Sequence, residues 1–262
     1  MKEVGETPLQ ATERLRTFHS IPKDVPLAYA GRLDPMASGL LLVLIGDECK
    51  RQEHYHTLDK AYDFEVLLGI GSDTHDVLGI VHAKTPVHPT HGEIRTALIP
   101  FIGEVTLPYP HFSAKTVQGK PLHMWTLEKR LHEIDVPTRT SRVYSLRILH
   151  EREEDIADIV RTVRESIARI PTVTDPRKAL GRDFRRNEVL ASWEQIQKAF
   201  PHTRFTILTL RAVASSGTYM RTLASCIGEK LGTTALAYSI HRTKIGRYVP
   251  LPLIGGVWVK KY

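Results

Sequence analysis

The chain has 262 residues, of which 42% are hydrophobic and 25% are charged, which is the composition of a folded globular protein rather than of a disordered one. Two cysteines are too few for a disulfide framework, and 36 Lys and Arg against 29 Asp and Glu leave a net charge of +7, which suits a polyanionic partner such as nucleic acid. The N-terminus has no apolar signal segment, and the longest apolar run, residues 40–45, is too short to span a bilayer, so we expect a cytoplasmic protein.

Helix and strand signals then alternate along the chain. Thr7 as N-cap and Pro8 in the first turn predict a helix that reaches Phe18. Asp34 and Pro35 favour a second short helix, after which an apolar strand covers residues 40–45. Three further strands are predicted over residues 62–70, 141–149 and 205–213, and a last helix over residues 218–231.

The pattern changes between residues 152 and 201. Apolar residues from Ile156 to Ile167 recur at helical spacing, and a second apolar series runs from Val189 to Phe200. The loop between these helices carries a basic cluster of Arg177, Lys178, Arg182, Arg185 and Arg186. We interpret the block as a helical insertion, and the absence of strict strand–helix alternation elsewhere favours an α+β fold.

Four short segments stand out, although each also has an ordinary structural interpretation. Residues 30–39, AGRLDPMASG, could simply form a tight turn capped by Asp34. Residues 215–221, SSGTYMR, open a helix, where the charge of Arg221 is unfavourable unless a carboxylate or phosphate faces it. Tyr62, in residues 59–64, would ordinarily belong to a strand surface, and residues 108–115, PYPHFSAK, would ordinarily form a surface turn.

Cofactor and metal motifs are missing from the sequence. It has no P-loop, no glycine-rich dinucleotide motif after a strand and no nucleophile elbow of the hydrolase type. Cys49, His54 and His56 lie close together, but no second pair of ligands completes a zinc spacing. We therefore expect neither a metal nor a cofactor.

Taken in order, the four segments resemble the active-site motifs of the bacterial tRNA pseudouridine synthase B family. The family segment G-x-L-D-P-x-A-x-G-[LMV]-L is matched by Gly31, Leu33, Asp34, Pro35, Ala37, Gly39, Leu40 and Leu41. The remaining motifs are matched by Asp59, Lys60 and Tyr62, by Ser113, Ala114 and Lys115 in a shortened loop, by residues 217–221 and by residues 240–243. The resemblance covers residues 2–150 and 203–250.

This resemblance implies a pseudouridine synthase-like core, with a central mixed, largely antiparallel sheet flanked by helices. It also implies cofactor-free isomerisation of uridine to pseudouridine in the T-loop of tRNA, at uridine 55. Asp34 would attack C1′, or take a proton from C2′ to give a glycal, and Arg221 would keep Asp34 ionised and oriented.

The resemblance further implies that the target base is flipped out of the RNA, which costs a few kcal/mol. Stacking of the base on an aromatic ring offsets about 1–3 kcal/mol of this. Tyr62 would stack on the base, Tyr219 and Ile240 would line the same pocket, and Lys115 would bind the substrate. The basic side chains proposed for contacts to RNA phosphates are Arg242, Lys244, Arg182 and Arg185.

The chain departs from the family pattern in three places. Tyr29 stands where the family has a histidine that helps to turn the base out, and its ring could wedge into the vacated stack. The chain begins with MKEVG, where the family has an earlier strand and a D-K-P-x-G segment. It ends at Tyr262, so we expect one catalytic domain over residues 1–262, with the insertion at 152–201 and no C-terminal PUA-like domain.

We therefore expect a monomeric tRNA pseudouridine synthase that binds the T-arm of tRNA and no membrane. A non-catalytic tRNA-binding chaperone and a synthase for a different RNA uridine are the alternatives. The combination of Asp34, Tyr62 and Arg221 favours an enzyme, because a pure binding protein does not need all three. The insertion would either supply RNA contacts or form a packed helical hairpin.

Overall fold

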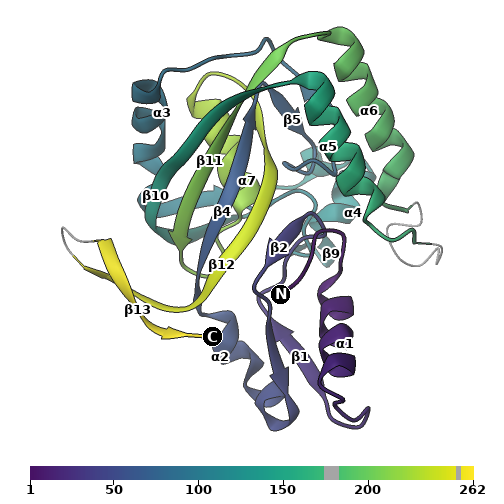
Figure 1. Cartoon of the computed structure of the whole chain (residues 1–262), viewed down its shortest axis with the longest axis vertical. Helices are drawn as coiled ribbons and strands as arrows, with labels where there is room; N and C mark the ends of the chain where they lie inside the picture. The colour runs from purple at the N-terminus through teal and green to yellow at the C-terminus, as the bar shows by residue number, and fades with distance from the viewer. Residues whose placement is uncertain (174–182, 252–254) are drawn as a thin grey trace.

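A seven-stranded sheet forms the centre of the computed structural model, which describes residues 1–173, 183–251 and 255–262 (Figure 1). Six strands follow the order β13 (Gly255–Lys261), β12 (Ala235–Leu251), β4 (Asp59–Leu68), β11 (Arg204–Ala214), β10 (Thr138–Asp155) and β7 (Gly103–Pro108). Neighbours on this path are antiparallel, whereas the short strand β2 (Ala37–Gly39) pairs in parallel with β12. The sheet is therefore mixed and largely antiparallel, which confirms the predicted fold class.

Four longer helices flank this sheet: α3 (His91–Leu98), α5 (Ile156–Ala168), α6 (Arg186–Ala199) and α7 (Met220–Lys230). Figure 1 shows α3 on one side of the strands, α5 and α6 together on the other side of the view, and α7 behind the strands. Phe64 and Leu208 of the sheet are fully buried in one cluster with Leu223 of α7. Burial of such side chains, worth about 1.5–3 kcal/mol each, holds the helices against the strands.

A smaller lobe carries the N-terminal fifth of the chain. It contains α1 (Pro8–Phe18), β1 (Leu27–Ala30), β3 (Leu42–Ile45), η1 (Gly46–Arg51) and α2 (Gln52–His56), and β1 pairs with β3. Its own apolar cluster includes Leu44, Tyr55 and Ile245. The remaining described elements are β5 (Ile70–Ser72), β6 (Val81–Ala83), η2 (Ile99–Phe101), β8 (Thr116–Val117), β9 (Lys120–Pro121), α4 (Leu122–Leu127), η3 (Leu131–Glu133) and η5 (Asp183–Arg185).

Most of the predicted elements are confirmed. The Thr7 side chain accepts a hydrogen bond from the backbone of Gln10, whose side chain accepts one from Thr7, so α1 begins with a capping box. The predicted strands lie in β4, β10 and β11, and the last predicted helix is α7. The strand predicted to reach residue 70 ends at Leu68 because Gly69 adopts a φ of +86° and turns the chain into β5.

The prediction of a short helix at Asp34 and Pro35 is wrong. A turn forms there instead, in which the Ala37 amide donates to the Asp34 carbonyl at 3.0 Å. Residues 37–39 then pair with residues 240–242 of β12. Because the backbone groups of residues 37–39 pair with β12 in the sheet, they are not available for the hydrogen bonds of a helix.

The predicted insertion is built into the main core. Strand β10 continues to Asp155, so the block begins in a strand, and α5 and α6 follow as the two expected helices. Ile159, Val163 and Trp193 are buried in the same cluster as the sheet. Arg177, Lys178 and Arg182 lie outside the described residues. None of the helices within the described ranges combines the length and the apolar character that a membrane crossing requires.

Candidate active site

Two glycines shape the segment that carries Asp34. Gly31 has a φ of +75° and Gly39 a φ of +110°. Residues with a Cβ atom rarely adopt such positive φ angles, whereas glycine adopts them readily. A Cβ atom at Gly39 would lie 2.3 Å from the carbonyl oxygen of Arg242, so glycine is required for β2 to approach β12. The segment between Gly31 and Gly39 connects β1 of the smaller lobe to β2 of the main sheet. The Asp34 side chain on this segment is 39% exposed.

Arg221 in the first turn of α7 faces this carboxylate. Its Nε lies 2.9 Å from Oδ2 of Asp34, and its Nη2 donates to Oδ1 at 3.3 Å. Nη1 donates to the Thr74 carbonyl at 3.0 Å. The carboxylate partner that the sequence analysis required for Arg221 is therefore present, although the two residues are far apart in the chain.

A second carboxylate, which the sequence analysis missed, completes this group. Asp76 is buried and its Oδ2 lies 3.7 Å from Nε of Arg221. Its Oδ1 accepts hydrogen bonds from Thr74 Oγ1 at 2.6 Å and from the Leu78 amide at 3.0 Å. The available signal was a polar run, GSDTHD, directly after an apolar strand.

The two carboxylates differ in their electrostatic environment. Burial raises the pKa of Asp76 to about 6, against the opposing effect of Arg221. Burial alone would lower the pKa of Arg221, but Asp34 and Asp76 together raise it above its ordinary value. The guanidinium therefore stays charged beside Asp34, the more accessible of the two acids.

Three buried basic side chains lie close to the segment around Asp34. The Lys2 ammonium donates to the carbonyls of Ala37 and Glu3 at 2.6 and 3.0 Å, and burial lowers its pKa to about 8. Lys60 donates to the carbonyls of residues 56 and 58, and burial likewise lowers its pKa to about 8. The sequence analysis matched Lys60 to a motif but assigned no role to either lysine.

The third is Arg242, for which the predicted phosphate contact does not fit the structure. It is 1% exposed, and its guanidinium donates to the carbonyls of Leu40 at 2.7 Å and Gly31 at 2.8 Å. Arg242 also lines the cavity described below, but its burial and its bonds to protein carbonyls do not favour a contact with an RNA phosphate. It ties together the two ends of the segment that carries Asp34.

A cavity of about 780 Å³ opens beside Asp34 and is lined by the predicted aromatic residues. Tyr62 of β4 and Tyr219, just before α7, both line it, and burial raises the pKa of each hydroxyl. Ile240 of β12 is 5% exposed and contributes an apolar wall. The Tyr219 ring lies 5.6 Å from that of Tyr109, at 57°.

Tyr29 does not belong to this wall. It is half-buried on β1, where it pairs with Val43, and its carbonyl accepts a hydrogen bond from Gln52 at 2.7 Å. It is not among the residues that line the cavity in the described part of the chain. The structure therefore offers no support for Tyr29 as a substrate contact.

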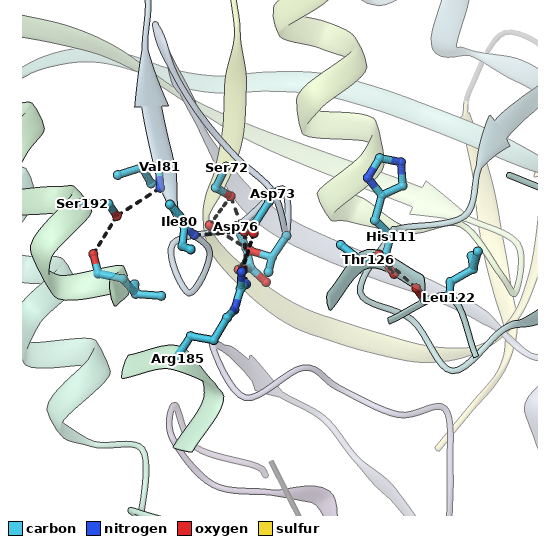
Figure 2. A network of polar contacts seen from close by, with 12 residues as sticks. Ser72, Asp73, Asp76, Ile80, Val81, His111, Leu122, Thr126, Arg185 and Ser192 are labelled. Atoms are coloured by element: carbon cyan, nitrogen blue, oxygen red, sulfur yellow. Dashed lines mark hydrogen bonds and ion pairs between the residues drawn. The ribbon is translucent and has the colours of Figure 1, made fainter. Parts of the chain in front are cut away.

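The other predicted basic contacts have different surroundings. Lys115 is exposed at the rim of the cavity, with its Nζ 5.4 Å from the centre of the Tyr109 ring. Lys244 is exposed on β12 and lies 6.0 Å from the Trp258 ring, away from the cavity lining. Arg185 lines the cavity but is held in an ion pair with Asp73 (Figure 2).

Together these residues present an accessible carboxylate beside a buried cation and flat aromatic walls. Such a carboxylate is suited to act as a nucleophile or as a base. The aromatic walls are suited to hold a planar, partly polar ligand. The geometry thus favours chemistry on a ring-shaped substrate.

Comparisons with known proteins agree with this arrangement. The chain is 28% identical over 240 residues to a tRNA pseudouridine synthase B of Aromatoleum aromaticum, covering 92% of this chain. It is 27% identical over 245 residues to a tRNA pseudouridine synthase B of Caldicellulosiruptor saccharolyticus, covering 94% of this chain. The chain spans 60% of the length of the first relative and 65% of the second.

The fold is also found among solved structures. A chain in the crystal structure of a Cbf5-Nop10-Gar1 complex has a TM-score of 0.54 and 18% identity, covering 94% of this chain and 47% of that one. The family described as TruB family pseudouridylate synthase (N terminal domain) matches residues 23–166, which is more than half of the sequence and includes Asp34, Tyr62 and Asp76. This chain belongs to the TruB family of pseudouridylate synthases.

Proposed function

We propose that this chain is a tRNA pseudouridine synthase that isomerises uridine to pseudouridine in the T-loop of tRNA, at uridine 55. One observation carries the proposal: Asp34, Arg221 and Tyr62 meet at one cavity in a chain of the TruB family. The two relatives compared above are tRNA pseudouridine synthases B. The net charge of +7 also suits a polyanionic substrate.

The reaction exchanges one bond for another within the same nucleotide. The C1′–N1 bond of uridine breaks, the uracil turns in the site, and a C1′–C5 bond forms. C5 loses its proton and N1 gains one, so the atoms balance without an oxidant, a reductant or a group donor. The protein must supply a carboxylate at the sugar, room for the base to turn, and surfaces that hold the freed uracil.

Asp34 is the residue that we assign to the sugar. It would either add to C1′ or remove a proton from C2′ to give a glycal, and both routes require the ionised form. Its carboxylate is 39% exposed beside the cavity, whereas that of Asp76 is 5% exposed and already accepts two hydrogen bonds. Arg221 contacts both oxygens of Asp34 and would fix the orientation of the carboxylate through a charge-assisted contact.

Aromatic stacking would hold the flipped base. Extracting a base from folded RNA costs a few kcal/mol, and one aromatic platform returns about 1–3 kcal/mol. We assign this platform to Tyr62, with Tyr219 and Ile240 as the adjoining walls, because all three line the cavity. Lys115 and Lys244, both exposed, would contact phosphates and so position the RNA without reading its sequence.

The test is the substitution Asp34→Asn, assayed with an unmodified tRNA transcript. We expect the variant to form no pseudouridine and to bind tRNA within several fold of the wild type, because the substitution removes the charge and keeps the shape. The matched control is Asp63→Asn, which changes a carboxylate on β4 that is paired with Arg211 away from the cavity. Wild-type turnover in the Asp34 variant would contradict the assignment.

The same assay separates the alternatives. If the wild-type chain binds tRNA but forms no pseudouridine in a single-turnover experiment, it is a binding protein and the proposal fails. Mapping pseudouridine in tRNA from cells with and without the chain checks the position. Loss of the modification at a uridine other than 55 would correct the proposed substrate.

A further inference from the structure

The inserted helical pair extends the active-site cavity. The turn η5, which precedes α6, places Asp183, Phe184 and Arg185 in the cavity lining, together with Val189 of α6. This turn comes from the block at residues 152–201, which is not part of the motif-bearing segments. The insertion therefore contributes surface to the same hollow as Asp34.

The backbone of η5 is strained. Asp183, Phe184 and Arg185 have φ angles of 45°, 54° and 59°. Each non-glycine residue in this left-handed region costs roughly 1–2 kcal/mol. Such conformations persist when surrounding contacts impose them, and they cluster at functional sites.

Ion pairs on both sides hold the turn in this conformation. Arg186 contacts Asp183 at 2.6 Å through Nε and also donates to the carbonyls of Ile167 and Ile170 at the end of α5, at 2.7 and 2.8 Å. On the other side, Arg185 binds both oxygens of Asp73, at 2.6 and 3.2 Å. Figure 2 shows Arg185 reaching Asp73 in the loop that also carries Asp76.

Further contacts fix Arg185 and α6. The Arg185 guanidinium lies 4.4 Å from the centre of the Phe112 ring, and its side chain is 14% exposed. Trp193 donates to the Val77 carbonyl at 3.1 Å, and Ser192 accepts from the Val81 amide at 3.1 Å. Both arginines beside the turn are therefore engaged by carboxylates and carbonyls within the protein.

Phe184 is the contrasting residue in this turn. Its side chain lines the cavity and is 43% exposed. Its two neighbours in the chain, Asp183 and Arg185, are each held in an ion pair. Burial of this ring in the folded chain therefore does not account for the strain of the turn. The turn therefore presents an exposed aromatic face at the cavity, on a backbone that the ion pairs of the neighbouring residues hold in place.

We propose that Phe184 stacks on a nucleobase of the bound RNA next to the uridine that enters the cavity. The inference rests on the proposed function, because it takes RNA as the ligand. An aromatic ring accepts the face of any base, so this contact adds affinity and holds the RNA without reading sequence. It supplies from the insertion the aromatic contact that the sequence analysis assigned to Tyr29.

The first test compares ring variants at position 184 by their affinity for an unmodified tRNA transcript. Phe184→Ala is expected to weaken binding about 5- to 150-fold, the range that stacking on one base represents. Phe184→Trp should stay within about threefold of the wild type, whereas Phe184→Leu should lose most of the affinity, because a leucine offers no π face. The control is Phe18→Ala, which removes an aromatic side chain on α1 that is 82% exposed.

The second test separates ligand binding from a structural role. Glycine adopts positive φ freely, so Phe184→Gly should preserve or raise the melting temperature while it weakens tRNA binding as much as Phe184→Ala. A structural role would instead lower the melting temperature in both variants. Affinity equal to that of the wild type in both variants, or equal losses in the tryptophan and alanine variants, would overturn the inference.

These results remain separable from a failure of the proposed function. If the wild type binds tRNA without forming pseudouridine, the affinity series still tests Phe184. If the wild type is active and the alanine variant binds and turns over tRNA as the wild type does, the inference fails alone. With stacking in the bound state, loss of the ring raises the Michaelis constant more than it lowers kcat.

Discussion

Arg221 lies between two carboxylates that differ in exposure. Its Nε is 2.9 Å from Oδ2 of Asp34 and 3.7 Å from Oδ2 of Asp76, and the two acid side chains are 39% and 5% exposed. One buried cation therefore serves both the accessible acid and the enclosed one. The function that we assign to Asp34 depends on this sharing, because Asp76 keeps the cation in place from the interior.

Replacing Arg221 by Gln should affect stability and activity together. Removal of one partner from a buried ion pair costs about 3–5 kcal/mol, since the remaining charge stays buried without compensation. We expect a loss of this size in the free energy of unfolding in urea, with no pseudouridine formed. Arg211→Gln is the control: its pair with Asp63 is half exposed, and such pairs contribute about 0–1 kcal/mol. Equal losses in the two variants would contradict the structural assignment.

Replacing Asp76 by Asn should change how stability depends on pH. The pKa of Asp76, about 6, lies above its ordinary value of 3.8, so between these values the folded chain binds more protons than the unfolded chain. Its contribution to stability is present below about pH 4 and is lost as the pH rises through 6. Asparagine does not ionise, so the Asp76→Asn variant does not lose stability in this way. The free energy of unfolding of the variant, relative to that of the wild type, should therefore rise by up to about 3 kcal/mol from pH 4 to pH 7.

The control for this pH series is Asp63→Asn. Asp63 is paired with Arg211 in a partly exposed ion pair, which is expected to contribute about 0–1 kcal/mol at most. Urea unfolding of the three proteins at both pH values supplies the comparison. A difference between the Asp76 variant and the wild type that stays constant with pH would show that ionisation of Asp76 carries no cost in the folded chain.

Gly39 and Gly46 form a matched pair for testing why the Asp34 segment needs glycine. Both have positive φ, +110° and +63°, but a Cβ at Gly39 would lie 2.3 Å from a backbone oxygen, whereas one at Gly46 meets nothing within 4 Å. Gly46→Ala should cost about 1–2 kcal/mol of backbone strain. Gly39→Ala adds a clash with β12 that the sheet must move to relieve, so we expect a loss above about 3 kcal/mol and reduced turnover. Similar losses in urea unfolding would show that the clash is unimportant.

Local patterns and the family resemblance together predicted the main parts of the site. A cation at a helix start is unfavourable without an anion nearby, so the sequence alone predicts a partner opposite Arg221. The motif resemblance then supplied Asp34 as that partner and Tyr62 and Tyr219 as neighbours. The strands were predictable because apolar and β-branched runs mark them even when they are far apart in sequence.

The residues that were missed or misplaced depend on how distant segments approach one another. A lysine near the N-terminus resembles a solvated charge, yet Lys2 is fully buried against backbone carbonyls. Arg242 was predicted to bind phosphate because an arginine that binds phosphate and one that binds carbonyls look alike in sequence. Phe184 stood in a basic loop, and its backbone strain and its position at the cavity exist only in the folded chain.

Lys2 should support the Asp34 segment in a pH-dependent manner. Lys2→Met removes the ammonium group that donates to the carbonyls of Ala37 and Glu3, at a cost of about 1–3 kcal/mol, and should reduce turnover more than tRNA affinity. The folded pKa of Lys2, about 8, lies below its ordinary value of 10.5, so between these values the unfolded chain binds more protons and wild-type stability rises with pH. The difference in free energy of unfolding between the wild type and Lys2→Met, measured in urea, should therefore widen from pH 7.5 to pH 9.5.

The control is Lys23→Met, at an exposed position, which should match the wild type at both pH values. A gap that narrows with pH would show that the ammonium form of Lys2 is favoured by the fold.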